Sequence, residues 1–342
     1  MIASVSRRRI GKRTLMLSCA AAGLMAQPAH AQLAGAFRGN ISSTTGTVTR
    51  NPTSNTAETI TVGSSTATIN WTPNDQQVGG GTIDFLPGGN VATFTSAAGL
   101  ADYTVLNRIV PTDATRPIGL NGSVISTLQG TNATGGKIWI YSPGGIVIGA
   151  TAVFDVGSLL LTTNDVSNLS SNTNAFSATF TGPASSTSKI QIMPGAQINA
   201  LQPGSYVALV APRIEQGGTV RVKGSAAYVA GEQVTMTMNQ GLFDIQVDVG
   251  TSDGNGIVHT GETSGPANKV VGDNHSIYMV AVPKNQALTM LLGGTVGFDA
   301  GSASVQNGQI ILSAGQGVSP TGFDNANLGG AVGGPQAGFT IR

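Results

Sequence analysis

The chain has 342 residues, of which 40% are hydrophobic, 10% are charged and 48 are glycines, and its formal net charge is +1. This apolar content is too high for an intrinsically disordered chain. The single cysteine, Cys19, excludes a disulfide-stabilised scaffold, so the fold must gain its stability from burial.

Residues 1–31 have the pattern of a secretory signal peptide. Basic residues between positions 7 and 13 precede a short apolar stretch at 15–25, and Ala29-His30-Ala31 is a cleavage site of the small-x-small type. Ordinary unfolded export, a twin-arginine route and, through Cys19, a lipid anchor all remain open. Cleavage would leave 12 basic and 16 acidic residues. That balance predicts no nucleic-acid partner, because such a partner requires a basic surface.

Beyond the signal, short β-branched runs alternate with turns rich in Gly, Asn and Ser, and similar runs recur about every twenty residues. The pattern of residues 204–211 returns at 224–230, and that of 195–200 returns at 218–223. We therefore predict an all-β fold, a right-handed parallel β-helix (a solenoid) with an amino-terminal cap and loop excursions. A pair of β-sandwiches is the alternative, because Asn121-Gly122 and Asn307-Gly308 are hairpin signals.

Four segments, in the same order and with similar spacing, carry a resemblance to a known family. They are residues 105–109 (VLNRI), 117–124 (PIGLNGSV), 136–149 (GKIWIYSPGGIVIG) and 152–160 (AVFDVGSLL). They resemble the two-partner-secretion domain of filamentous haemagglutinins and contact-dependent-inhibition exoproteins. The resemblance implies an exported β-helical protein that an outer-membrane two-partner transporter accepts through its periplasmic domains.

The same resemblance implies a secretion motif. The residues that match it are Asn107, Arg108, Ser142, Pro143, Gly144, Gly145 and Ile146. The family pattern at the turn is Asn-Pro-Asn-Gly-Ile, so Ser142 and Gly144 each stand where the family has asparagine. The domain division that follows is a signal peptide at 1–31, a two-partner-secretion (haemagglutination-activity-like) domain at 32–166, and continuing β-helix coils at 167–342. Polar, turn-rich segments predict excursions from the coils at 167–188 and 250–275.

Two groups of titratable residues are candidates for a chemical site. Asp253, His259, Glu262, Asp273 and His275 are the densest such group, but they lack metal-ligand spacing. Asp155 and Asp299 recur in a Phe-Asp-x-Gly-Ser unit and favour corner turns over catalytic carboxylates. We therefore expect no catalytic residue, no metal and no cofactor.

The sequence favours an exported surface adhesin or exoprotein comprising a secretion domain and the first coils of a shaft. Its partners would be the transporter and a host or neighbouring-cell surface. A β-helical polysaccharide lyase or hydrolase, and the stalk of a contact-dependent toxin, remain alternatives. A lyase or hydrolase would require clustered carboxylates with basic residues on one face.

Overall fold

The computed structural model describes residues 35–75, 81–131, 133–171, 175–239, 241–266, 274–284, 287–299, 308–313, 317–318 and 338–341. The predicted signal peptide at 1–31 lies outside these ranges. The described part of the chain is built from strands and turns and contains no α-helix. Accordingly, none of its segments is a helix able to span a membrane.

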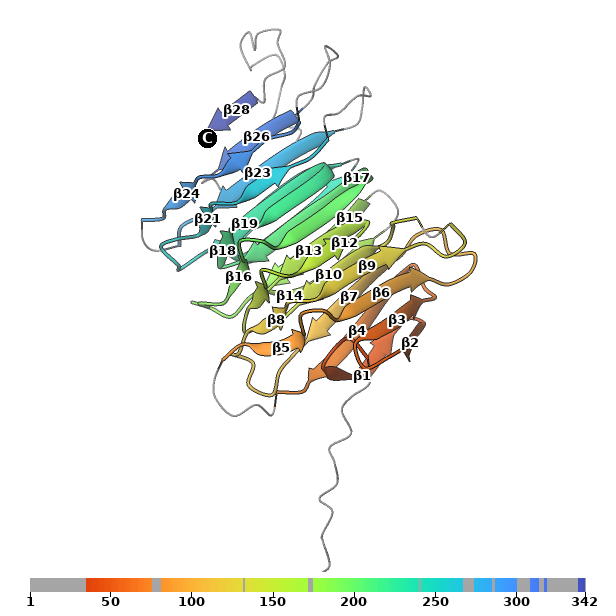
Figure 1. Ribbon diagram of the computed structural model, residues 1–342. Coiled ribbons are helices and arrows are strands. Elements are labelled where there is room, and N and C mark those ends of the chain that lie inside the picture. The colour runs from red at the N-terminus through yellow and green to blue at the C-terminus, as the bar shows by residue number, and fades with distance from the viewer. Residues whose placement is uncertain are drawn as a thin grey trace, which may run out of the picture. The chain divides into compact units, whose positions relative to one another are not determined.

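Three parallel ladders form the coils, and the chain visits them in the same order on each turn (Figure 1). The first ladder contains β3 (Ala57–Val62), β6 (Val91–Ser96), β9 (Ser123–Thr127), β12 (Val153–Asp155), the first parts of β17 (Gln197–Ala211) and β19 (Thr219–Asn239), β22 (Glu262–Ser264) and β25 (Thr295–Val296).

The second ladder contains β4 (Thr66–Pro73), β7 (Thr104–Ile109), β10 (Lys137–Tyr141), β13 (Ser158–Thr162), the middle parts of β17 and β19, β23 (His275–Ala281), β26 (Gly308–Ser313) and β28 (Gly338–Ile341). The third contains β5 (Ile83–Leu86), β8 (Ile118–Leu120), β11 (Ile146–Ile148), β16 (Lys189–Ile192), β18 (Arg213–Gln216), β21 (Ile257–His259) and β24 (Met290–Leu292).

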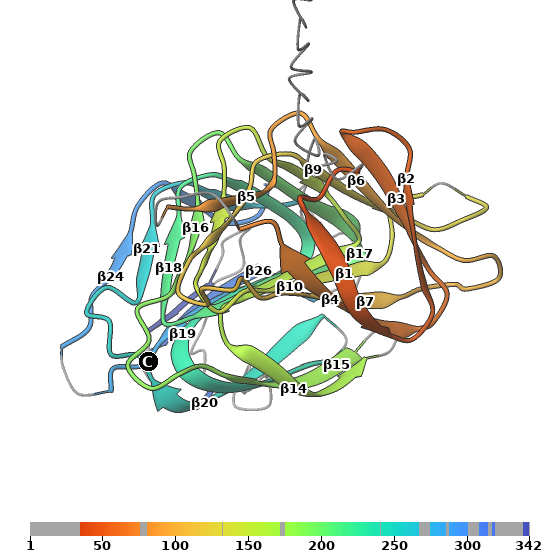
Figure 2. The ribbon, with the colours of Figure 1, turned by 90° about the horizontal axis from the view of Figure 1, so that it is seen from below.

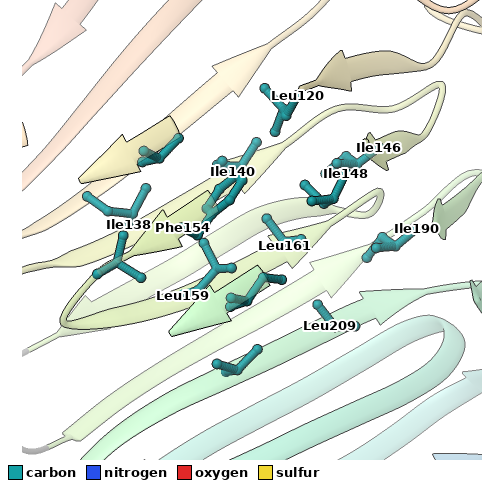
Figure 3. Close-up of a cluster of buried hydrophobic side chains, with 14 of the residues drawn as sticks. Leu120, Ile138, Ile140, Ile146, Ile148, Phe154, Leu159, Leu161, Ile190 and Leu209 are labelled. Carbon is teal, nitrogen blue, oxygen red and sulfur yellow. The ribbon is translucent and has the colours of Figure 1, made fainter. Parts of the chain in front are cut away.

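Alternation along the strands explains how the coils stack. In β16, Ile190 and Ile192 are buried and the residues between and before them are partly exposed. Equivalent aliphatic residues from successive coils fill one interior core, as the side chains in Figure 3 show. The repeat predicted between 204–211 and 224–230 is real, because Ser205 pairs with Gly224 and Ala211 with Ala230. The predicted β-helix is confirmed, and parallel pairing excludes the sandwich alternative.

A second layer covers the outer face of the second ladder (Figure 2). It is an antiparallel sheet of β14 (Asp165–Ser171), β15 (Ala175–Thr181), the last part of β19, β20 (Leu242–Gly250) and β27 (Gly317–Val318). Its inner face, with Phe176, Phe180 and Phe243, packs against Trp139 and Tyr206 of the coils in a second apolar core. We call this layer the cover sheet.

The segments that leave the coils are those that form the cover sheet, and they differ in part from the predicted excursions. The segment predicted at 167–188 does leave the coils, but as the ordered hairpin of β14 and β15. The excursion predicted at 250–275 is wrong for its described central part, because β21 pairs in parallel within the third ladder and β22 within the first. The second departure is instead the last part of β19 with β20, whose regular alternation looks like a coil strand in the sequence.

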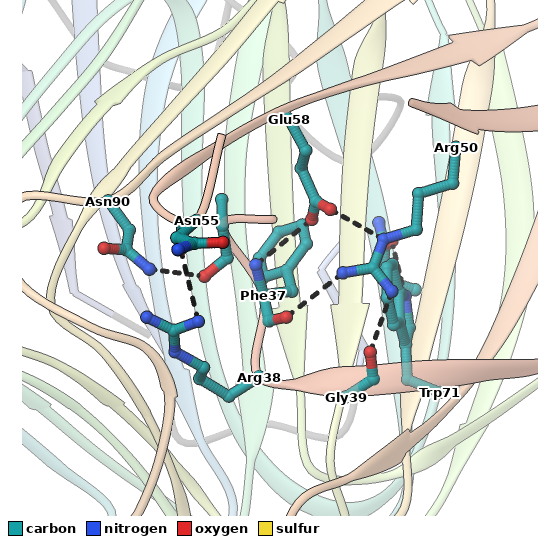
Figure 4. Close-up of polar contacts among 10 residues, drawn as sticks. Phe37, Arg38, Gly39, Arg50, Asn55, Glu58, Trp71 and Asn90 are labelled. Atoms are coloured by element: carbon teal, nitrogen blue, oxygen red, sulfur yellow. Dashed lines mark hydrogen bonds and ion pairs between the residues drawn. The ribbon is translucent and has the colours of Figure 1, made fainter. Parts of the chain in front are cut away.

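The amino-terminal end of the coils is closed by β1 (Gly39–Thr45), β2 (Val48–Pro52) and the segment before them. Phe37 stacks on Phe85 with ring centroids 5.0 Å apart, and its amide donates to Glu58 at 3.1 Å. Arg50 bonds Glu58 at 2.6 Å and the Phe37 carbonyl at 3.1 Å, and lies over the ring of Trp71 (Figure 4). This cap satisfies the backbone groups that an open first coil would leave exposed.

Candidate functional site

The turn at 142–146 joins the second ladder to the third. The amide of Gly145 donates to the Ser142 carbonyl at 3.4 Å, and the Ser142 amide donates to Thr162 of the next coil at 3.1 Å. Ile146 then enters β11 between Ile118 and Ile190 of the adjacent coils. The turn is therefore held on both sides by neighbouring coils.

Both glycines of the turn are required by the backbone. Gly145 has φ +124°, a conformation that side chains disfavour, and a Cβ there would lie 3.1 Å from the Lys189 carbonyl oxygen. A Cβ on Gly144 would overlap the carbonyl group of Arg116 in the preceding coil. Arg116 is itself held by bonds from its guanidinium to Gly81 at 3.0 Å and Asp75 at 2.9 Å. The absence of the family asparagine at position 144 matches this close approach.

Ser142 is fully buried, and its hydroxyl has no hydrogen-bond partner among the described residues. Pro143 and Gly144 are half-buried, while Gly145 and Ile146 are buried. The folded turn thus presents little of the motif to a partner.

Asn107 points into the interior of the coils and is 3% exposed. Its Oδ1 accepts from the indole nitrogen of Trp71 at 3.1 Å, and its Nδ2 donates to the Trp139 carbonyl at 3.2 Å. It therefore links the coils of β4, β7 and β10, whose strands lie side by side.

Arg108 points outward from the next position. Its guanidinium forms a bidentate ion pair with Asp165 of the cover sheet, at 2.5 and 2.9 Å, and lies 4.9 Å from the ring centroid of Tyr141. The Asp165 hydrogen bonds raise the pKa of Arg108 above its ordinary value, so the guanidinium stays charged. Because Arg108 pairs with Tyr141 in the ladder, β7 places it next to the turn that begins at Ser142.

The structure thus brings the seven predicted motif residues to one end of β7 and β10. Sequence patterns did not predict the residues that hold them, chiefly Trp71, Asp165 and Arg116. One signal could have found the first of these: the chain has only two tryptophans, and both contact Asn107. No sequence pattern links Arg108 to Asp165 across 57 positions.

The other candidate groups are dispersed in the structure. Among the described residues no three His, Cys, Asp or Glu side chains gather as metal ligands, and Asp273 lies outside those residues. Asp155 pairs in register with Asn199, whereas Asp299 bonds Arg221 at 3.3 Å, so the two aspartates do not form a pair. His259 is buried inside the coils.

Comparison with known proteins agrees with this geometry. The family model described as the TPS secretion domain matches residues 87–271, which is more than half of the chain and contains every predicted motif residue. The chain belongs to this family. As a TPS secretion domain it is part of a secreted exoprotein of a two-partner system, exported across the outer membrane by a TpsB transporter.

A solved structure similar to this TPS secretion domain is the crystal structure of the HMW1 secretion domain from Haemophilus influenzae. The two chains are 16% identical, the match covers 80% of this chain and 76% of that one, and the TM-score is 0.47. No curated protein matches the sequence.

Proposed function

We propose that the chain is a non-catalytic adhesin-type exoprotein, of the filamentous-haemagglutinin and contact-dependent-inhibition kind, whose transporter recognises Asn107, Arg108 and the 142–146 turn before the chain folds. Folding on the far side of the membrane then withdraws this motif into the coils. The folded exoprotein would display its coils on the cell surface or release them, where they meet a host or neighbouring cell.

The burial of the motif carries this proposal. Asn107 is 3% exposed and Ser142 is 0% exposed, so a transporter contacting the folded domain could reach neither side chain. A motif recognised in the unfolded chain has no such restriction. The interior hydrogen bonds of Asn107 would also help to keep the folded chain from returning, because each buried bond must be broken to expose it.

The non-catalytic assignment is supported by the positions of the carboxylates. Asn199 separates Asp155 from Arg221 in the first ladder, and Arg221 engages Asp299 in an ion pair, so the two aspartates do not face each other as an acid pair. A β-helical lyase or hydrolase would need carboxylates and basic groups converging on one substrate.

The proposal is tested by separating recognition from stability at Asn107. Trp71→Phe removes the indole donor to Asn107 and leaves the asparagine in place, whereas Asn107→Ala removes the asparagine itself. Each variant is expressed with the transporter, the secreted fraction is quantified, and the thermal stability of the purified chain is measured.

We expect Asn107→Ala to reduce secretion several-fold more than Trp71→Phe does, after allowance for any difference in stability. Ser142→Ala supplies the complementary case, because it removes a hydroxyl without a described partner and should leave stability unchanged while lowering secretion. Secretion that simply follows stability in all three variants would refute recognition of the motif.

A further inference from the structure

A chain of polar groups crosses the otherwise apolar interior between β19 and β24. The hydroxyl of Tyr228 lies 2.7 Å from Oγ1 of Thr263, which lies 2.9 Å from Nε2 of His259. The other ring nitrogen of His259, Nδ1, lies 2.8 Å from the carbonyl oxygen of Gly293. Tyr228, Thr263 and His259 are all fully buried.

The Gly293 carbonyl determines where each proton lies. A carbonyl oxygen only accepts, so Nδ1 of His259 must carry a proton and donate it. In the neutral ring Nε2 is then the acceptor, and it takes the hydroxyl proton of Thr263. Thr263 in turn accepts from Tyr228. Three donors meet three acceptors, and all the hydrogen bonds run in one direction.

A second proton on the ring breaks this order. Nε2 would become a donor to Thr263. Thr263 would then either donate to Tyr228, whose own proton loses its acceptor, or accept from both neighbours and leave its own proton without an acceptor. One buried donor is left unpaired, and a positive charge is placed in an apolar interior, both of which disfavour the fold.

Few titratable groups among the described residues face this ring. Tyr228 is the one that contacts it from β19, and burial raises the pKa of its hydroxyl, so Tyr228 stays neutral. The register partners of His259 do not titrate: they are Gln216 of β18, whose amide nitrogen donates to backbone carbonyls, and Leu292 of β24. Glu215 and Glu262 alternate to the outside of their strands, where Glu215 bonds Lys189 and Glu262 bonds Ser264.

The burial of His259 also favours the neutral ring that the hydrogen bonds assign. Burial lowers the pKa of His259 below its ordinary value of 6.5, while the bond to Gly293 opposes part of that change. The folded state therefore binds the second proton less readily than the unfolded state does. The stability that the neutral ring contributes is complete above about pH 6.5 and is lost as the pH falls below it.

We infer that His259 is an acid-sensitive switch inside the coils: neutral conditions keep the coil of β21 and β22 closed, and mild acid loosens it. The switch is local, because the hydrogen-bonded chain joins only β19, β21, β22 and the turn after β24. The coils that carry the secretion motif contain no part of it.

The test uses the mature chain and its His259→Gln variant, which keeps a donor and an acceptor without a titrating charge. Hydrogen exchange and thermal unfolding are followed between about pH 8 and about pH 5, the interval in which an imidazole titrates. The exchange rates are corrected for their intrinsic pH dependence. Residues 257–264 report on the switch, and residues 137–141 are the internal control.

In the wild type we expect corrected exchange at residues 257–264 to accelerate several-fold on acidification, with little change at residues 137–141. His259→Gln should abolish this local acceleration, and His275→Gln should retain it. Equal acid sensitivity in the wild type and His259→Gln would overturn the inference. Should His259→Gln fail to fold, the wild type alone decides, because uniform acceleration over both segments also contradicts a local switch.

Discussion

Gly144→Ala should destabilise the folded chain, because the space beside Gly144 is already filled. A Cβ at this position overlaps the backbone carbonyl of Arg116, which cannot swing aside as the tip of a flexible side chain can. Moving that carbonyl strains the bonds that the Arg116 guanidinium makes to Gly81 and Asp75. Overpacking of this kind costs about 1–3 kcal/mol. At about 1.5 °C per kcal/mol for a chain of this length, the melting temperature should fall by about 1.5–4.5 °C.

The chain contains a matched control. Pro87-Gly88-Gly89 repeats the tripeptide Pro143-Gly144-Gly145, yet a Cβ on Gly88 would meet nothing closer than 3.4 Å. Gly88→Ala should therefore leave the melting temperature within about 1 °C of the wild type, as expected for a surface substitution away from special features. Thermal unfolding followed by circular dichroism measures both variants. Equal melting temperatures for Gly144→Ala and Gly88→Ala would refute the reasoning.

Three further predictions concern the motif and the cover sheet. Gly145→Val should cost about 1–3 kcal/mol of stability through its positive φ, and it should lower secretion several-fold, whereas Gly89→Val should carry a similar strain with normal secretion. Tyr206→Phe should cost about 1–3 kcal/mol in a urea titration, because it leaves the buried indole nitrogen of Trp139 without its 2.7 Å partner. Asp165→Asn weakens a partly exposed ion pair and should cost only about 0.2–1 kcal/mol, an effect that high salt should diminish. A cost for Asp165→Asn that did not change with salt would count against an electrostatic origin.

Much of the fold could be predicted because every coil repeats the same alternation of buried and exposed residues. Alternation in residues 189–192 and the recurrence of 204–211 at 224–230 both follow from strands that pack one face inward. The cover sheet was not predicted, because alternation along a strand shows that one face is buried but does not show which element covers that face. Val234, Met236 and Met238 alternate as a coil strand would, yet they pack in the second core.

The candidate site, like the fold, could be predicted only in part. Local chemistry predicted the turn, since Pro143 followed by two glycines permits a reversal that few other residues would. The contacts that give Asn107 and Arg108 their roles come from residues 36 and 57 positions away. Such partners depend on the number of residues in each coil, and no single segment of sequence contains that information. The buried environment of His259 was missed for the same reason, because its hydrogen-bonded partners belong to two other strands and a turn.

The order in which the cover sheet is assembled has a consequence for delivery of the chain. β15 pairs with the last part of β19, so Phe176 lies opposite Met238, which is 62 positions further along the chain. If the coils stack in chain order, the hairpin of β14 and β15 emerges with its aromatic face bare and one strand edge unsatisfied. The hairpin then stays exposed until β16, β17 and β18 have folded onto the coils. During that interval the same edge can accept the late strand of a second molecule. The number of chains crossing side by side, and the speed with which each one crosses, would then decide how often two exoproteins exchange this strand.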